Sequence, residues 1–188
     1  MKRESLLKEL RVFWEKNNVP NISDINAQFL RDIIKIKKAK SILEIWTANW
    51  FSTIHLWIEA EKNNGKVVSI DFSIPSHKMA QENIKKADLE RTVELLFWDA
   101  LDIIPTLHSR FDFVFIDGMM KSSVNFLKAV WDKTLPWWVI IVDDVIKFKE
   151  KMSGLDDFLR INNIKHSVLP LDITDGIMMI IKEDITLK

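Results

Sequence analysis

Short apolar runs alternate with longer amphipathic segments through most of the chain, and this alternation constrains the fold more than any other feature. Each run is 5 or 6 residues long and rich in Val, Ile, Leu and Phe, which is typical of a strand buried on both faces. Strands joined through helices pair in parallel. The predicted strands are 41–45, 66–71, 92–97, 111–116 and 138–143, and the predicted helices between them are 52–62, 75–87, 100–108 and 122–134.

The end of the chain departs from this alternation. After a short helix predicted at 153–161, the apolar runs 164–171 and 176–182 are separated by only four residues, 172–175. A link of that length permits an antiparallel hairpin but not a crossover. We therefore predict an α/β fold with a doubly wound, mostly parallel seven-stranded sheet that ends in a C-terminal antiparallel hairpin.

Two amphipathic segments precede the first predicted strand. Residues 4–17 carry apolar side chains at helical spacing, and Ser23 is placed to cap a second helix that runs to about Lys38. With 188 residues, of which 47% are hydrophobic, we expect a single domain over 1–188. It comprises N-terminal helices in 1–38 and a Rossmann-like core in 39–188.

Charge and residue usage argue against several classes of protein. The formal net charge is zero, so no global charge favours nucleic acid or a membrane surface. Cysteine is absent, which excludes disulfides and thiolate metal sites. Neither a signal peptide nor an apolar run long enough to cross a membrane is visible, so we expect a cytoplasmic protein with no membrane partner.

Residues 44–52 have the position of a loop that binds a phosphate or a cofactor, between a predicted strand and a predicted helix. Such loops use glycine where the backbone needs a positive φ or must approach a ligand closely. Here Trp46 and Trp50 stand where glycine is expected. The segment therefore combines the position of a binding loop with side chains that oppose binding.

The same substitution pattern recurs elsewhere in the chain, which has 8 tryptophans and only 4 glycines. Three further tryptophans stand at predicted turns beside strands: Trp98, Trp137 and Trp138. Two explanations stay open. A genetic code that reads a stop codon as glycine would create the pattern if that codon were translated as tryptophan. Alternatively, the tryptophans are genuine and the chain is an engineered or decayed relative that cannot hold its ligand. Three other tryptophans are well explained as ordinary core residues: Trp14, Trp57 and Trp131.

Acidic residues stand at or near the ends of the predicted parallel strands, where open α/β sheets bind ligands. Asp71 lies 21 residues after Trp50, the spacing at which an acidic residue binds the ribose hydroxyls of an adenosine cofactor. Asp99 is placed to accept a hydrogen bond from an adenine amine, with the Ala100 N–H facing the ring. Asp99 as the N-cap of the next helix is compatible with that role.

Asp117, Asp143 and Asp144 end two strands that should be neighbours in the sheet. Three carboxylates in one small volume repel one another unless a cation joins them. Oxygen ligands suit Mg²⁺, Mn²⁺ or Ca²⁺ better than zinc. We therefore predict a divalent cation site here, with plain turn-forming aspartates as the alternative.

From about residue 20 to 182 the chain resembles the metal-dependent small-molecule O-methyltransferases, which use S-adenosylmethionine and include catechol and caffeoyl-coenzyme A methyltransferases. Each stretch is a weak signal alone, but six occur in the family's order. The matching stretches are the loop 43–52, the ribose segment 69–71, the adenine turn 98–100, the metal-bearing strand ends 115–117 and 142–145, and the closing hairpin 169–177.

The resemblance implies roles for individual residues. The implied cofactor contacts are Glu44, Trp46, Thr47, Ser52, Asp71, Asp99, Ala100 and Asp117, with Ser52 and the loop amides holding the methionine carboxylate. The implied metal ligands are Asp117, Asp143 and Asp144. Lys121 is the implied general base, one position later than the family's lysine, and Asp144 replaces the family's usual asparagine.

The leading hypothesis is methyl transfer from S-adenosylmethionine to a metal-bound hydroxyl of a small molecule, in a homodimer by analogy with the family. Alternatives are a tRNA hydroxyuridine-type O-methyltransferase, with the basic segment 147–151 near phosphate, and an inactive scaffold if the tryptophans are genuine. A nicotinamide dehydrogenase is disfavoured, because neither the hairpin nor the carboxylate cluster has a role there.

Overall fold

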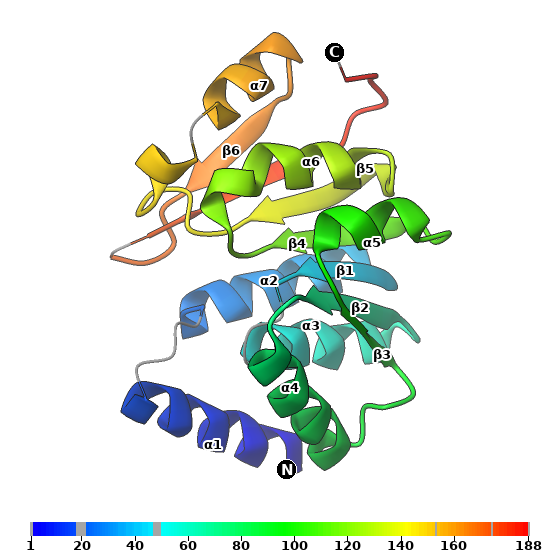
Figure 1. The fold of residues 1–188 in the computed structure, drawn as a ribbon, viewed down its shortest axis with the longest axis vertical. Helices are drawn as coiled ribbons and strands as arrows, with labels where there is room; N and C mark the ends of the chain where they lie inside the picture. Colours follow the sequence, from blue (N-terminus) through cyan, green and yellow to red (C-terminus); the bar gives the residue numbers. More distant parts are fainter. Residues whose placement is uncertain (1, 18–21, 47–49, 153, 174, 188) are drawn as a thin grey trace.

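The computed structural model describes residues 2–17, 22–46, 50–152, 154–173 and 175–187. Its centre is a seven-stranded sheet with the order β3-β2-β1-β4-β5-β7-β6 (Figure 1). The strands are β1 Ser41–Ile45, β2 Lys66–Asp71, β3 Val93–Phe97, β4 Phe111–Ile116, β5 Thr134–Val142, β6 His166–Leu169 and β7 Ile177–Ile181.

The predicted fold class is confirmed. Strands β1 to β5 pair in parallel, whereas β7 is antiparallel to both β5 and β6. The chain starts in the middle of the sheet at β1, builds outward to β3, then returns to β4 on the other side of β1. This reversal is the point at which open α/β sheets bind their ligands.

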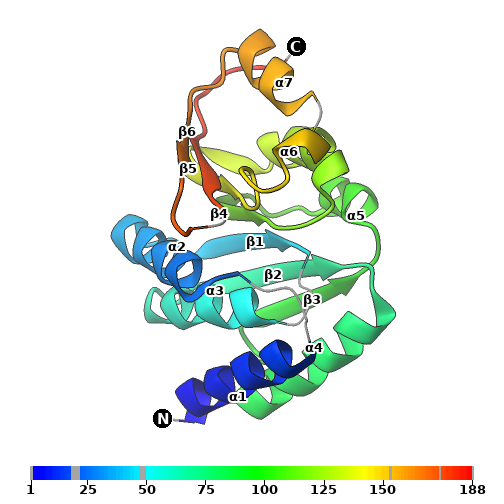
Figure 2. The ribbon, with the colours of Figure 1, turned by 90° about the vertical axis from the view of Figure 1, so that its left-hand side faces the viewer.

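Helices cover both faces of the sheet (Figure 2). The first face carries α1, α2, α3 and α4, and the second carries α5, α6 and α7, so alternate residues of each central strand enter separate cores. In β1, for example, Ile42 packs into the first core and Leu43 into the second. The helices are α1 Lys2–Asn17, α2 Asp24–Lys37, α3 Phe51–Lys62, α4 Ile74–Ala87, α5 Ala100–Thr106, α6 Ser123–Trp131 and α7 Leu155–Ile161, with short 3₁₀ turns η1 Met120–Ser122 and η2 Lys149–Lys151.

The start of α2 follows from its sequence. Ser23 has extended backbone angles and its hydroxyl accepts a hydrogen bond from the Asn26 N–H, so the predicted N-cap is present. The residue after the helix, Lys38, is its C-cap. Lys38 has a φ of 54°, and its N–H donates to the carbonyls of Ile34 and Lys35.

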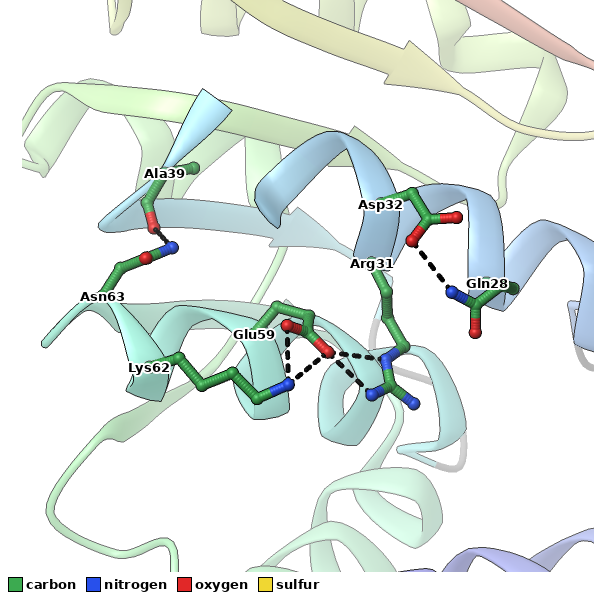
Figure 3. A network of polar contacts seen from close by, with 7 residues as sticks. All are labelled: Gln28, Arg31, Asp32, Ala39, Glu59, Lys62 and Asn63. Carbon is green, nitrogen blue, oxygen red and sulfur yellow. Dashed lines mark hydrogen bonds and ion pairs between the residues drawn. The ribbon is translucent and has the colours of Figure 1, made fainter. Parts of the chain in front are cut away.

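A polar network fastens α2 to α3 (Figure 3). The Glu59 carboxylate is 4% exposed and accepts two hydrogen bonds from Arg31 and two from Lys62, all between 2.7 and 2.9 Å. Burial alone would raise the pKa of Glu59, but the bonds from Lys62 and Arg31 outweigh it and the pKa lies below its usual value. This buried carboxylate therefore holds α2 against α3.

One detail of the prediction is wrong. Trp137 and Trp138 do not form a turn but lie inside β5, which begins at Thr134. The Trp137 N–H donates to the Lys182 carbonyl at 2.7 Å, and the Lys182 N–H donates to the Trp138 carbonyl at 2.8 Å. These bonds extend the ladder with β7 past the predicted strand start. The pairing with β4 shifts register before Val139, and Trp137 has a φ of 69° there.

Among the residues that the structure describes, no helix has the length and apolar character that crossing a bilayer requires.

Candidate active site at the carboxyl edge of the sheet

The predicted acidic residues lie along one edge of the sheet, where the parallel strands end. Asp71 is the last residue of β2, Asp117 directly follows β4, and Asp143 directly follows β5. Glu44 stands one residue before the end of β1. Because β2, β1, β4 and β5 are consecutive in the sheet, the strands themselves gather these carboxylates.

Glu44 is fully buried at the centre of this edge. One carboxylate oxygen, Oε2, accepts hydrogen bonds from the Thr53 hydroxyl and, at 2.6 Å, from the Ser69 hydroxyl. The other oxygen, Oε1, is buried and has no partner. Burial raises the Glu44 pKa to about 7, although hydrogen bonds from Ser52, Ser69 and Thr53 act in the opposite direction. An unpaired buried carboxylate oxygen is costly, so it points to a donor that the site is built to receive.

Four of the predicted cofactor contacts surround one small cavity. Trp46, Asp71, Asp99 and Ala100 all line a space of about 10 Å³. Asp71 is 3% exposed, and its Oδ1 accepts the Ser73 N–H at 2.6 Å. The structure therefore brings the residues predicted to contact ribose and adenine around one cavity at the carboxyl edge of the sheet.

This cavity is far smaller than ligand sites of about 300–1,000 Å³, and it has no room for a nucleoside. Aromatic side chains fill the space. The Trp46 indole packs edge-on against the Phe72 ring at a centroid distance of 5.0 Å. It also lies directly on Gly118, where an added Cβ would approach the indole to 2.6 Å. The Trp98 indole closes another wall, with its Nε1 bonded to Asp102 at 3.1 Å.

The remaining predicted cofactor positions lie near this cavity or outside the described part of the chain. Ser52 is 6% exposed in the first turn of α3 and bonds to Glu44. Thr47 lies outside the described residues. Asp99 caps α5 by accepting the Leu101 N–H at 2.9 Å, so the alternative role considered for Asp99 is present.

Asp117, Asp143 and Asp144 act on one another electrostatically. Burial raises the Asp117 pKa well above its usual range, and the charges of Asp143, Asp144 and Glu44 add to the effect. Burial likewise raises the Asp143 pKa to about 7 and the Asp144 pKa to about 8. Such a set of carboxyls is stable when it holds protons or when it meets a cation.

The carboxylates are neighbours, but they do not form a finished metal site. Over the described ranges, no group of three or more His, Cys, Asp or Glu side chains is arranged to hold a metal ion. The donor chemistry of Asp117, Asp143 and Asp144 fits a hard divalent cation, because all their donor atoms are oxygen. Binding would therefore require these side chains to turn toward a common point.

Asn26 joins this site from α2 and was missed by the sequence reasoning. Its side-chain N–H donates to Asp143 Oδ1 at 3.2 Å, although the two residues are 117 positions apart. The Asn26 side chain is buried, and its carbonyl oxygen has no partner. A single asparagine in the first turn of an amphipathic helix gives no signal of such a contact.

Asp175 is a second addition, from the link between β6 and β7. Its Oδ1 accepts the backbone N–H groups of Ile146 and Lys147 at 3.2 and 3.1 Å, which fixes the segment after β5. Its Oδ2 is buried without a hydrogen-bond partner, and the nearby Asp175 carboxyl adds to the burial that raises the Asp144 pKa.

Lys121, the predicted general base, lies on η1 and is exposed. The structure gives no test of its role, which stays a prediction. In the basic segment 147–151, the ammonium groups of Lys147 and Lys151 lie 5.1 and 4.4 Å from the Phe148 ring centroid. This segment directly follows the acidic end of β5.

The strand order, the closing hairpin and the acidic carboxyl edge together define the Rossmann-like fold of class I methyltransferases. Comparison with known proteins identifies the family within that class. A family described as O-methyltransferase matches residues 1–182, and the chain belongs to this family.

Named relatives and a solved structure agree with this assignment. Catechol O-methyltransferase of Mycobacterium tuberculosis is 31% identical over 137 residues, which cover 72% of this chain and 62% of that protein. Catechol O-methyltransferase of Niastella koreensis is 29% identical over 132 residues, covering 68% and 59%. The chain thus spans about 60% of the length of these curated relatives. An O-methyltransferase from Bacillus cereus, solved in complex with SAH, has a TM-score of 0.82 at 26% identity, covering 95% of this chain and 91% of that one.

Proposed function

We propose that the protein is an O-methyltransferase that takes its methyl group from S-adenosylmethionine and transfers it to a hydroxyl of a small molecule. The buried Glu44 Oε1, unpaired at the topological switch point of the sheet, carries this proposal. S-adenosylmethionine brings an ammonium and a sulfonium, and both positive charges suit an edge where Asp71 and Asp117 accompany Glu44. The relatives named for catechol methylation and the neighbour in complex with SAH support the same chemistry.

Different residues of the chain would bind different parts of S-adenosylmethionine. Glu44 Oε1 accepts hydrogen bonds from the ammonium, and Ser52 at the start of α3 lies where the methionine carboxylate meets helix N–H groups. Asp71 accepts hydrogen bonds from the ribose hydroxyls, and Asp99 with Ala100 borders the adenine position. These contacts orient the methyl group toward the acidic end of β4 and β5.

For the acceptor side we propose a divalent cation, with Mg²⁺ first and Mn²⁺ or Ca²⁺ as alternatives, held by Asp117, Asp143 and Asp144. When bound, such an ion supplies charge stabilisation to an ionised acceptor oxygen. Asn26 fixes Oδ1 of Asp143 through its side-chain N–H. Lys121, exposed beside this edge, is the candidate to take the acceptor proton. Catechol-type relatives favour an acceptor with two adjacent hydroxyls.

The polar groups of the site suit S-adenosylmethionine, but the cavity is too small for it. With indoles at 46 and 98, the cavity of about 10 Å³ excludes the nucleoside. The proposed activity therefore belongs to a chain in which position 46 is small. Were the indoles permanent, the molecule would be a methyltransferase-fold scaffold without activity. A homodimer through the first two helices remains a prediction, as does the tRNA alternative.

The test measures S-adenosylhomocysteine binding by calorimetry for the chain and for its Trp46→Gly and Trp46→Gly/Trp98→Gly variants. We expect binding only after the cavity is opened. Adding Asp71→Ala to the binding variant should weaken affinity by about 1–3 kcal/mol, whereas Asp88→Ala, exposed at the end of α4, should not. Absence of binding by every opened variant would refute the proposal. Loss of methyl transfer to catechol on EDTA treatment, with S-adenosylhomocysteine binding retained, is the result expected for the cation.

A further inference from the structure

We infer that positions 46, 50 and 137 are glycine in the polypeptide that the source cell makes, and that glycine at 46 is what opens the donor cavity. The inference rests on the backbone and packing at each tryptophan, and it deepens the proposed function by identifying which residues allow the nucleoside to enter. It sorts five of the described tryptophans into two groups by geometry.

The backbone separates the first group. Trp46, Trp50 and Trp137 have φ values of 76°, 81° and 69°, in the left-handed region where a Cβ is unfavourable. The other non-glycine residues with positive φ in the described ranges are mostly asparagine and aspartate or lie at helix ends, where this conformation is common. A bulky aromatic residue there is an outlier, and three in one chain require a common cause. Glycine adopts these angles without strain.

Hydrogen bonding separates the groups independently. Trp57 and Trp131 are almost fully buried and each donates its indole N–H, Trp57 to the Thr92 hydroxyl and Trp131 to the Ile185 carbonyl. Trp50 is equally buried, but its indole N–H has no partner. Buried tryptophans normally find a partner for this group. Trp57 and Trp131 therefore belong to the core, whereas Trp50 fills a position that lacks an acceptor for it.

Packing at position 46 links the assignment to function. The Trp46 indole occupies the cavity wall formed by Asp71 and Phe72, and it presses on the backbone of Gly118. Glycine at 46 removes the indole that lines the cavity, while the residue 46 N–H keeps its hydrogen bond to the Ile70 carbonyl at 2.9 Å. At 137 the residue lies in the irregular part of β5 and its side chain is 63% exposed, so glycine there loses little packing.

A single mechanism explains the three positions. A codon that the source cell reads as glycine, translated with a code that reads it as tryptophan, places an indole at sites selected for glycine. The same translation leaves true tryptophans, such as Trp57 and Trp131, unchanged in the mature chain. Decay of a binding site does not explain position 137, which lies outside the cavity.

Mass spectrometry of the protein isolated from its source cells tests this directly, because peptide masses distinguish the two residues without any requirement on folding. We expect glycine at 46, 50 and 137 and tryptophan at 57 and 131. Tryptophan at 46, 50 or 137 would overturn the inference, and so would glycine at 57 or 131, because geometry would then fail to sort the residues. These outcomes are independent of whether an opened recombinant variant binds S-adenosylhomocysteine, which tests the proposed function.

A second measurement uses recombinant protein. Trp137→Gly should melt at a higher temperature than the tryptophan-containing chain, because its indole is 63% exposed and glycine relieves the strained φ of 69°. Trp98→Gly is the matched control at an exposed position without a positive φ, and it should melt no higher. A Trp137→Gly variant that melts lower than the tryptophan-containing chain would contradict the inference.

Discussion

Replacing Glu44 by glutamine should make the protein more stable at high pH while weakening donor binding. The Glu44 carboxyl is fully buried, and its pKa is raised from an ordinary 4.5 to about 7. A carboxyl with a raised pKa favours the folded state below pH 4.5, where it is protonated in both states. That contribution is lost as pH rises through 7, because folding must then hold a buried charge. Glutamine removes the charge and keeps the shape.

The magnitude follows from the pKa. A rise from 4.5 to about 7 corresponds to about 3 kcal/mol of folding free energy at about 1.4 kcal/mol per pKa unit. We therefore expect the unfolding free energy of Glu44→Gln to exceed that of the parent chain by about 3 kcal/mol at pH 8.5, and by little at pH 4.5. Glutamine can still meet the hydroxyls of Thr53 and Ser69, which accept as well as donate.

Urea unfolding measured from pH 4.5 to 8.5, with EDTA and without cofactor, gives the difference directly. Glu82→Gln, an exposed carboxyl on α4, is the matched control and should show no such pH dependence. A stability difference for Glu44→Gln that stays flat across this range would refute the reasoning. In an opened variant, the same substitution should weaken S-adenosylhomocysteine binding by about 1.5–3 kcal/mol, since a charge-assisted bond to the ammonium is lost.

Three further predictions concern the helices that cover the first face. Glu59→Ala should cost about 1–3 kcal/mol in urea unfolding because it leaves the partly buried Arg31 guanidinium without its carboxylate partner, whereas Asp32→Ala, with one exposed bond, should cost under about 0.5 kcal/mol. Burial lowers the His55 pKa to about 4, so protonation of this histidine opposes folding as the pH falls. Between pH 6.5 and 4 the parent chain should lose about 2–3 kcal/mol of unfolding free energy that His55→Leu retains. Equal acid sensitivity of both proteins would contradict this. Asn26→Leu should weaken Mn²⁺ binding about 10–100-fold in calorimetry by releasing Asp143, and unchanged affinity would show that Asn26 only packs.

The sheet could be predicted because its signal is local. Each central strand is a short apolar run, and observed strands such as Ser41–Ile45, Lys66–Asp71 and Phe111–Ile116 match the predicted ranges. The C-terminal hairpin could be predicted because only four residues, 172–175, separate its two apolar runs. The beginning of β5 could not be predicted, because Trp137 and Trp138 are held in the strand by pairing with Lys182, a residue 44 positions later than Trp138.

The acidic part of the candidate site could also be predicted, since strand direction alone brings Asp71, Asp117 and Asp143 to one edge. The contact of Asn26 with Asp143 and the closure of the cavity could not be predicted. The Asn26 contact depends on how α2 packs across the sheet, which no sequence pattern specifies. The closure depends on the direction of the Trp46 side chain, which follows from a positive φ that the sequence only suggested.

The bond from Asn26 to Asp143 makes α2 part of the candidate site and not an appendage of the sheet. A change in the tilt of α2 would displace an oxygen of Asp143 directly, without any alteration in the strands. A deletion mutant lacking residues 1–38 would lose the hydrogen bond that orients Asp143.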